Sequence, residues 1–300
     1  MGSEPLLECV VNISEGRDLA VVNEITDAAG TLALDVHSDP HHNRSVLTLA
    51  GPRDLLSSVV RQVATATVAR IDITRHQGVH PRIGALDVVP FVDLAPFVIP
   101  SDLPSRFSRS APVEATARSQ ASPQACEQRD RFAAWAAEHL NLPCFLYGDG
   151  RPLPEVRRFA WRTLKPDVGP PHPHPTAGAV AVGCRPALVA YNVWLADADL
   201  DAAKAIAASL RSSQVRALGL QVGDRVQVSF NLVEPIACGP GRVYDAVAAV
   251  AAVSRAELVG LVPRQVLRAE SRSRWAELDL SEGQTIEARL EEAGLDGGRF

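Results

Sequence analysis

The order of apolar segments in the first third of the chain constrains the fold more than any other feature of the sequence. Residues 6–12 and 86–92 have the composition of buried strands, and two shorter apolar segments, 32–36 and 45–50, form a pair between them. Two amphipathic helices separate these strands. The first follows Asp18, a favourable N-cap, and the second carries Leu56, Val59, Val60, Val63 and Ala64 on one face. The predicted order, strand-helix-strand-strand-helix-strand, is that of a ferredoxin-like fold.

The second half of the chain repeats this order of elements without repeating the residues. Strands are predicted at 179–183, 188–195, 215–221, 225–233 and 257–261, with helices at 200–212, 240–254 and 284–293. We therefore expect an α/β (α+β) fold of two similar subdomains, each a mixed or antiparallel sheet with helices on one face. The expected subdomains are residues 1–177 and 178–300. Residues 98–124 form an irregular insertion in the first, followed by a helix at 123–140 and a strand at 144–147.

Composition indicates a globular, cytoplasmic protein. The chain is 46% hydrophobic and 22% charged, and its net charge of −5 argues against nucleic acid or an anionic membrane as partner. We find no signal peptide and no apolar run of membrane-spanning length. The five cysteines are widely spaced without a Cys-x-x-Cys pair, and we expect them to be reduced thiols, mostly core filler.

The stretch from His76 to Phe91 is the strongest candidate for a reactive site. It begins as a polar, glycine-containing loop and continues into the buried strand at 86–92. Pro81 restricts the backbone of His80, and the neighbouring Arg82 disfavours a positive charge on its imidazole. A histidine on a loop braced by a core strand is suited to general acid–base catalysis. A turn histidine that bonds only to backbone remains the alternative.

Other polar residues gather at predicted strand ends, in loops 12–17, 37–44, 76–82 and 167–178. If the first three loops meet at one sheet edge, Arg17, Arg44 and Arg82 form a basic patch suited to carboxylate ligands. Asn43 is either a left-handed turn residue or an amide contact for a ligand.

The histidines do not favour a metal site. His76 and His80 have the spacing of a zinc helix, but the stretch lacks the catalytic glutamate and contains Gly78 and Pro81. His172 and His174 have no carboxylate or thiol nearby at ligand spacing, so we expect no metal. The proline-rich loop 167–178 is either a linker or a pre-set backbone on which a flat ring can lie.

Several stretches resemble the formiminotransferase domain family over about residues 6–268. They are Glu8-Cys-Val-Val-Asn-Ile-Ser-Glu-Gly-Arg17, Ser38-Asp-Pro-His-His-Asn-Arg-Ser45, Arg75-His-Gln-Gly-Val-His-Pro-Arg-Ile-Gly-Ala-Leu-Asp-Val-Val-Pro-Phe91, Pro166-Asp-Val-Gly169, Ala187-Leu-Val-Ala-Tyr-Asn-Val-Trp-Leu195, Gln227-Val-Ser-Phe-Asn-Leu232 and Glu257-Leu-Val-Gly-Leu-Val-Pro263. The stretch 75–91 is the most specific of these.

This resemblance implies transfer of the formimino group of N-formimino-L-glutamate to tetrahydrofolate, a step of histidine degradation. It further implies two α/β subdomains with folate between them, usually in a homodimer. Animal members carry a cyclodeaminase domain after this one, so the chain resembles the stand-alone bacterial form. Tetrahydrofolate would be a co-substrate, and no metal is required.

The resemblance also assigns residues. His80 falls on the catalytic histidine of the family, and residues 169–178 and 212–221 fall on folate-contacting segments. The candidate substrate- and folate-binding residues are His37, Asp39, Asn43, Arg44, Arg82, Gly169, His172, His174, Thr176 and Gly178.

The chain departs from the family pattern at three places. Animal enzymes have an acid at the position of His37, for which Asp39 is a candidate replacement; residues 150–166 are shortened and 98–121 are inserted. Two alternatives therefore remain: formyl transfer between 5-formyltetrahydrofolate and glutamate, and folate binding without catalysis.

Overall fold

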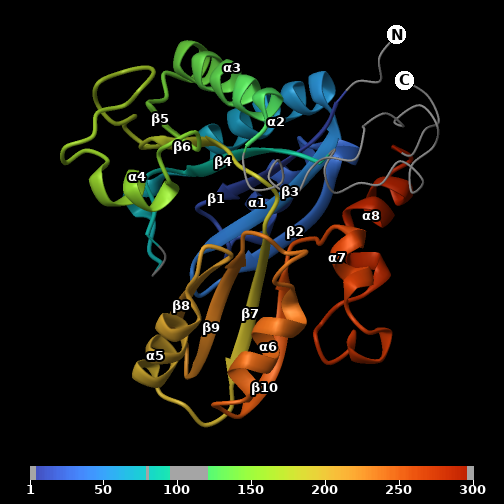
Figure 1. Ribbon diagram of the computed structural model, residues 1–300. Helices are drawn as coiled ribbons and strands as arrows, with labels where there is room; N and C mark the ends of the chain where they lie inside the picture. The colour runs from blue at the N-terminus through green and yellow to red at the C-terminus, as the bar shows by residue number, and fades with distance from the viewer. Residues whose placement is uncertain (1–4, 79–80, 95–120, 296–300) are drawn as a thin grey trace. The chain divides into compact units, whose positions relative to one another are not determined.

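The computed structural model describes residues 5–78, 81–94 and 121–295. The chain divides into two compact units, one formed mainly by residues up to Pro186 and the other mainly by residues from Ala187 onward (Figure 1). We describe each unit by itself.

The first unit contains a six-stranded sheet in the order β2-β3-β1-β4-β6-β5. Its helices and strands are β1 (Leu6–Ile13), α1 (Leu19–Asp27), η1 (Gly30–Leu32), β2 (Ala33–Asp39), β3 (Arg44–Pro52), α2 (Arg53–Arg70), η2 (Ile73–Arg75), β4 (Leu86–Asp93), α3 (Pro123–Leu140), β5 (Cys144–Tyr147), α4 (Leu153–Phe159) and β6 (Val180–Cys184). Strand β1 pairs antiparallel with both β3 and β4, whereas β6 pairs parallel with both β4 and β5. The first four strands and two helices confirm the predicted ferredoxin-like order.

Local sequence explains the start and the packing of these helices. Asp18 caps α1 by accepting hydrogen bonds from the backbone N–H groups of Ala20 and Val21, as the sequence predicts. The five apolar residues predicted to share one face of α2 are all buried. The predicted helix at 123–140 and strand at 144–147 are α3 and β5, with the expected bounds.

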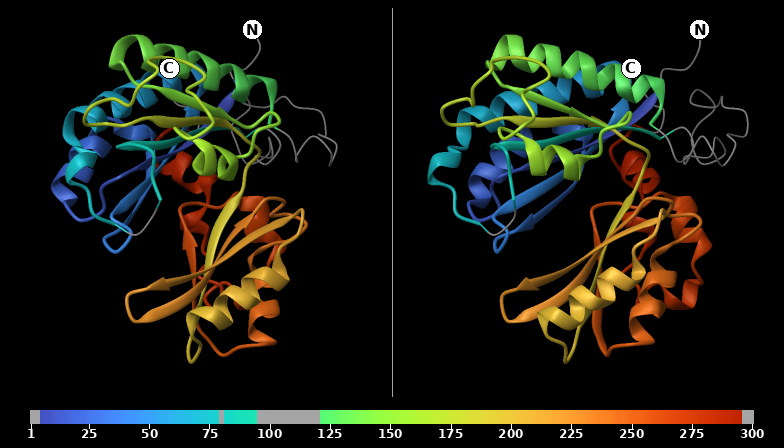
Figure 2. Two further views of the ribbon diagram at one scale, coloured as in Figure 1. Left: turned by 90° about the vertical axis from the view of Figure 1, so that its left-hand side faces the viewer. Right: turned by 60° about the vertical axis from the view of Figure 1, so that its left-hand side comes forward.

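Helices α1, α2 and α3 cover one face of the six-stranded sheet, as expected (Figure 2). The rings of Phe91 on β4 and Phe132 on α3 lie 6.0 Å apart on this face. Helix α4 is not one of these three covering helices. Its Val156 packs with Val88 and Ala181 in a separate apolar cluster. Strands β4, β5 and β6 are almost entirely buried, so this part of the sheet is covered on both sides.

The second unit contains a four-stranded antiparallel sheet in the order β10-β7-β9-β8. Its elements are β7 (Val189–Leu195), α5 (Leu200–Leu210), β8 (Val215–Val222), β9 (Arg225–Leu232), α6 (Pro240–Ala248), β10 (Val253–Val259), α7 (Arg264–Ala269), η5 (Arg272–Arg274), η6 (Glu282–Gln284) and α8 (Ile286–Glu292). From β7 to β10 the order again matches the ferredoxin-like pattern. The two sheets thus share one four-stranded plan, which confirms the expected similarity of the two halves.

The structure differs from the sequence analysis at the boundary between the halves. The strand expected to open the second half is β6, which pairs with β4 through Ala181 opposite Val88. It therefore belongs to the sheet of the first unit, and the chain leaves that unit after Pro186 and not after residue 177. Of the expected insertion at 98–124, residues 98–120 lie outside the described part of the chain, and Ser122 caps α3.

The cysteines also differ in part from expectation. Cys126 on α3 and Cys184 on β6 form a disulfide, with their Cα atoms 5.0 Å apart. The prediction that all five thiols are reduced is therefore wrong for this pair, because α3 packs on β6 and brings together residues separated by 58 positions. Cys9, Cys144 and Cys238 are free and buried, which confirms their role as core filler.

Candidate functional site

The four polar loops selected from the sequence all belong to the first unit, and Asn43 joins three of them. Its side-chain oxygen accepts a hydrogen bond from the N–H of Gly16 at 2.9 Å, and its amide donates to the carbonyl of Gln77 at 3.0 Å. Its own carbonyl lies 2.9 Å from Nε2 of His76. Asn43 has a φ of 49°, so it is the left-handed turn residue that was one of the two expectations.

Two glycines allow these loops to approach one another. A Cβ on Gly16 would lie 2.5 Å from the carbonyl oxygen of Asp39 and 2.6 Å from the backbone nitrogen of Arg44. A Cβ on Gly78 would overlap the carbonyl oxygen of His42. Loops 12–17 and 76–82 therefore both lie directly against loop 37–44, and a side chain at either glycine would force them apart.

The end of the fourth loop forms a tight turn beside the segment that leads into β4. His174 and Gly178 exchange two backbone hydrogen bonds of 2.7 and 3.0 Å, and Nδ1 of His174 accepts the N–H of Ala177 at 3.0 Å. The carbonyl of Thr176 accepts from Ile73 at 2.9 Å. Three of the predicted ligand-binding residues, His174, Thr176 and Gly178, thus border the segment 73–85.

The other predicted binding residues of loop 167–178 and of β2 do not border the described part of residues 73–85 in the same way. Gly169, with a φ of +93°, packs against the turn between α3 and β5, near Leu142. His172 is exposed. On the edge strand β2, His37 pairs with Val46 of β3, and Asp39 pairs with Arg44 of β3.

Asp39 and His42 form a close pair at the tip of loop 37–44. The carboxylate of Asp39 lies 2.5 Å from Nδ1 of His42 and also accepts the backbone N–H groups of His41 and His42. Burial raises the pKa of Asp39, but the hydrogen bonds from His42 and His41 outweigh it and hold the pKa below its usual range. Asp39 is therefore ionised and fixes the turn before Asn43.

A charged cluster connects Arg44 with residues that the sequence analysis did not select. The guanidinium of Arg44 donates to the side-chain oxygen of Asn12 on β1. Burial lowers the pKa of Arg44 to about 10, while the nearby carboxylate of Asp87 opposes this effect and Arg157 adds to it. Asp87 is 1% exposed and pairs with Arg157 of α4, with 2.7 Å between Nη2 and Oδ2. An acid inside the apolar run 86–92 was the available sign of this cluster, because a buried carboxylate requires a partner.

The expected basic patch forms in part. Arg82 bonds to the imidazole of His76 and to the carbonyl of Gly78, the latter at 3.1 Å. Burial lowers the pKa of His76, and the adjacent Arg82 lowers it further, which outweighs the hydrogen bond to Asn43. Arg17 is exposed and binds the carbonyl of Pro40 at 2.8 Å.

His80, the predicted general acid–base, lies outside the described residues. The residues around it in sequence are described as far as Gly78 on one side and from Pro81 on the other. Within residues 5–78, 81–94 and 121–295, no group of three or more His, Cys, Asp or Glu residues is arranged to hold a metal ion. In the same part of the chain, no helix is both long and apolar enough to cross a membrane.

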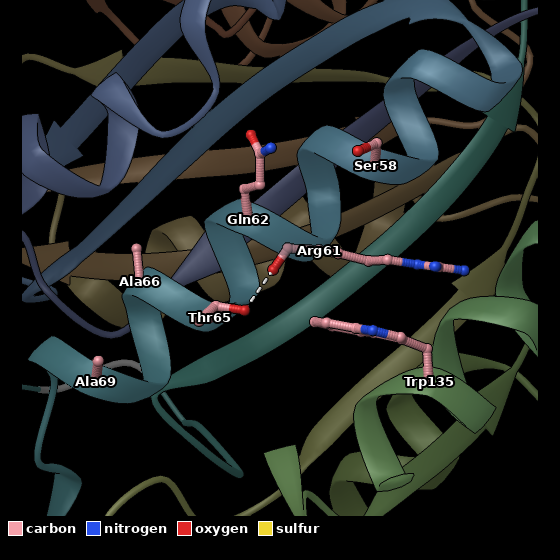
Figure 3. Close-up of a pocket in the computed structure, with 7 residues that line it drawn as sticks. All are labelled: Ser58, Arg61, Gln62, Thr65, Ala66, Ala69 and Trp135. Atoms are coloured by element: carbon pink, nitrogen blue, oxygen red, sulfur yellow. Dashed lines mark hydrogen bonds between the residues drawn. The ribbon is translucent and has the colours of Figure 1, made fainter. Parts of the chain in front are cut away.

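A hollow of about 480 Å³ lies between α2 and α3, away from the four loops (Figure 3). The guanidinium carbon of Arg61 lies 5.4 Å from the centroid of the Trp135 ring, and both residues line the hollow. The lining residues are Ser58, Arg61, Gln62, Thr65, Ala66, Ala69 and Trp135. Because all of them belong to the two helices, this hollow is separate from the polar cluster at the strand ends.

Comparison with known proteins shows the family of the chain. Residues 6–185 match the sequence profile of the formiminotransferase domain, N-terminal subdomain. The chain is 32% identical over 293 residues to the glutamate formimidoyltransferase of Streptococcus pyogenes, which covers 87% of this chain and 90% of the relative. It is 31% identical over 321 residues to the glutamate formimidoyltransferase of Thermoplasma acidophilum, with 96% and 98% covered. It is also 31% identical to the formimidoyltransferase-cyclodeaminase of Sus scrofa, of which it spans 51%.

Proposed function

The chain belongs to the formiminotransferase domain family and is a transferase, and we propose that it moves the formimino group of N-formimino-L-glutamate to N5 of tetrahydrofolate. The products are 5-formiminotetrahydrofolate and glutamate. The names of the two stand-alone relatives support the donor. Tetrahydrofolate acts in this proposal as a co-substrate, and the transfer uses no metal.

The reaction requires one proton to move between two nitrogens. N5 of tetrahydrofolate attacks the formimino carbon, and a tetrahedral intermediate forms. The bond from this carbon to the glutamate nitrogen then breaks, and glutamate leaves as a neutral amine only if its nitrogen gains a proton. We assign this transfer to His80, which takes the proton from N5 and donates it to the leaving glutamate nitrogen. Such general acid–base catalysis contributes about 10²–10⁴-fold in rate.

The observation that carries the proposal is the attachment of residues 76–78 to Asn43, next to the half-buried guanidinium of Arg44. Asn43 ties these residues to the loop that begins β3, and the next residue, Arg44, donates to Asn12 on β1. Both substrates bring carboxylates, since formiminoglutamate is a diacid and tetrahydrofolate carries a glutamate. Guanidinium groups bind such carboxylates in paired hydrogen bonds, so we assign Arg44 and Arg82 to substrate binding.

The remaining assignments concern the folate. His174, Thr176 and Gly178 form the turn beside residues 73–85, so they are the members of loop 167–178 best placed to contact a ring held near loop 76–82. Asp39 is ionised and tied to His42, so it supplies negative charge near the position where animal enzymes carry an acid and this chain has His37. Gly169 and His172 complete the proposed contact segment.

The first test is turnover of the purified protein with N-formimino-L-glutamate and tetrahydrofolate, beside the His80→Ala variant. The proposal expects wild-type formation of 5-formiminotetrahydrofolate and its loss in the variant. His139→Ala is a matched control, because this histidine stacks on Trp135 near the end of α3 and its Nδ1 lies 3.1 Å from the carbonyl oxygen of Trp135 on the same helix. Turnover only with 5-formyltetrahydrofolate and glutamate would replace the proposed donor, and folate binding without either reaction would refute a catalytic role.

We propose further that the protein acts as a cytoplasmic homodimer in histidine degradation, as the family resemblance suggests. Sedimentation analysis of the purified protein tests the dimer. A gene neighbourhood that encodes other enzymes of histidine breakdown would support the pathway, and growth on histidine that is unaffected by deletion of the gene would contradict it.

A further inference from the structure

Arg157 connects α4 to the loop that carries the proposed catalytic histidine. Its Nη1 donates to the carbonyl oxygen of Pro81 at 2.7 Å, and its Nη2 donates to Oδ2 of Asp87 at 2.7 Å. One planar guanidinium thus bridges the loop and strand β4. Pro81 is the residue that follows His80 in the sequence, so this bond holds the peptide unit between Pro81 and Arg82, one residue beyond the proposed acid–base.

Asp87 provides the second contact with the same loop. Its Oδ1 accepts the backbone N–H of Ile83 at 2.8 Å, and its side chain is 1% exposed. The pairing of β1 with β4 shifts register next to Asn12, at the level of Asp87. Such an irregularity redirects a side chain from its regular face and is common beside active sites. The Arg157–Asp87 pair therefore holds the loop at two points, Pro81 and Ile83.

Helix α4 gives Arg157 a fixed position. The preceding residue, Val156, is fully buried and packs in the cluster that contains Val88 and Phe145. This packing fixes the position of α4 on the sheet. The backbone of Arg157 is therefore held by a packed helix. The adjacent Arg158 is exposed and lies over the ring of Phe159 instead.

We propose that Arg157 is a positioning residue for the transfer reaction: together with Asp87 it holds the backbone of residues 81–83, which directly follow His80 in the sequence. This inference rests on the proposed function of His80. The inference assigns a role to α4 (Leu153–Phe159), which lies within residues 150–166, the segment expected from the family resemblance to be shortened. A displacement of about 1 Å in a reacting group can lower the rate about 10²-fold. Loss of the contacts of Arg157 with Pro81 and Asp87 should therefore lower kcat.

The experiment compares Arg157→Met and Arg157→Lys with wild type, with Arg158→Met as the matched control on the same helix. We expect Arg157→Met to lower kcat by about 10²-fold and to leave KM for both substrates within about threefold. Arg157→Lys keeps the charge but cannot hold both partners in one fork, so an intermediate kcat is expected. Arg158→Met should match wild type. Thermal unfolding of each variant checks that it is folded.

A double-variant cycle separates positioning from a general structural role. If Arg157 acts through His80, Arg157→Met should cause no further loss in a His80→Ala background, where the residual rate no longer depends on the imidazole. An equal loss in both backgrounds would overturn the inference, as would unchanged kcat in Arg157→Met or a loss that appears only in KM. If Arg157→Met does not fold, Arg157→Lys and Asp87→Asn are measured in the same two backgrounds.

Failure of this inference is distinguishable from failure of the proposed function. An inactive wild-type protein, or an active His80→Ala variant, would refute the role of His80 itself. Wild-type turnover that depends on His80 but not on Arg157 would refute the positioning role alone.

Discussion

Replacement of Glu8 by glutamine should stabilise the protein, and the gain should grow with pH. Glu8 lies in the central strand β1 and is 5% exposed. Burial raises its pKa from 4.5 to about 7, although the nearby guanidinium of Arg185 lowers it. A carboxyl group whose pKa is raised by folding contributes full stability below its unfolded value, and this contribution is lost as the pH rises through the folded value.

The magnitude follows from these two pKa values. A shift of one pKa unit corresponds to about 1.4 kcal/mol, so ionisation of Glu8 costs the folded state about 3 kcal/mol at pH 8 and about 1 kcal/mol at pH 5. Glutamine has nearly the same shape but cannot ionise. Relative to wild type, the advantage of Glu8→Gln in unfolding free energy should therefore grow from about 1 kcal/mol at pH 5 to about 3 kcal/mol at pH 8.

Urea unfolding of wild type and variant at several pH values between 5 and 8 measures this difference. Glu138→Gln is the control, because that carboxyl group is 78% exposed on α3 and its substitution should have little effect at any pH. A Glu8→Gln variant that is less stable than wild type at pH 8, or whose advantage does not change with pH, would refute the reasoning.

Three further predictions follow from the loops and from the disulfide. Gly78→Ala should destabilise the protein by about 1–3 kcal/mol in urea unfolding and lower turnover, because its Cβ would overlap the carbonyl of His42; a neutral substitution would show that the loops are not packed as described. Thiol titration of the unfolded, unreduced protein should find three free thiols, and a count of five would contradict the Cys126–Cys184 bond. Loss of this bond, which joins residues 58 positions apart, should lower the unfolding free energy by about 4 kcal/mol. Asp39→Asn should lower the unfolding free energy by about 1–2 kcal/mol at pH 7, and this loss should shrink as the pH falls below 3.8, the ordinary pKa of this group. A loss that stays constant down to pH 3 would contradict the assignment of Asp39 as an ionised, hydrogen-bonded carboxylate.

The sequence predicted the elements that depend on local pattern. Apolar residues at helical spacing predicted α2 and α3, and the strand-helix-strand-strand-helix-strand order of each half is confirmed. It assigned β6 to the second half, because parallel pairing with β4 joins residues that are distant in the chain and leaves no local signal. The disulfide between α3 and β6 was missed for the same reason.

The candidate site was predictable only at the level of loops. The predicted element order put the polar loops 12–17, 37–44 and 76–82 at strand ends, where they could gather at one sheet edge, and the hydrogen bonds of Asn43 show that the described parts of these loops meet. The sequence did not single out Asp87 and Arg157, which lie 70 positions apart. Their contact depends on the register of β4 and on the packing of α4, which only the folded structure defines.

The most direct test of the central claim is a single-turnover experiment, with enzyme in excess over N-formimino-L-glutamate at saturating tetrahydrofolate, in wild type and His80→Ala. Tetrahydrofolate binding is measured in parallel by fluorescence titration, so that chemistry is separated from affinity. We predict rapid formation of 5-formiminotetrahydrofolate by the wild type, and a chemical step at least about 10²-fold slower in the variant, with unchanged binding. An unchanged single-turnover rate in His80→Ala would contradict the assignment of His80 as the group that moves the proton.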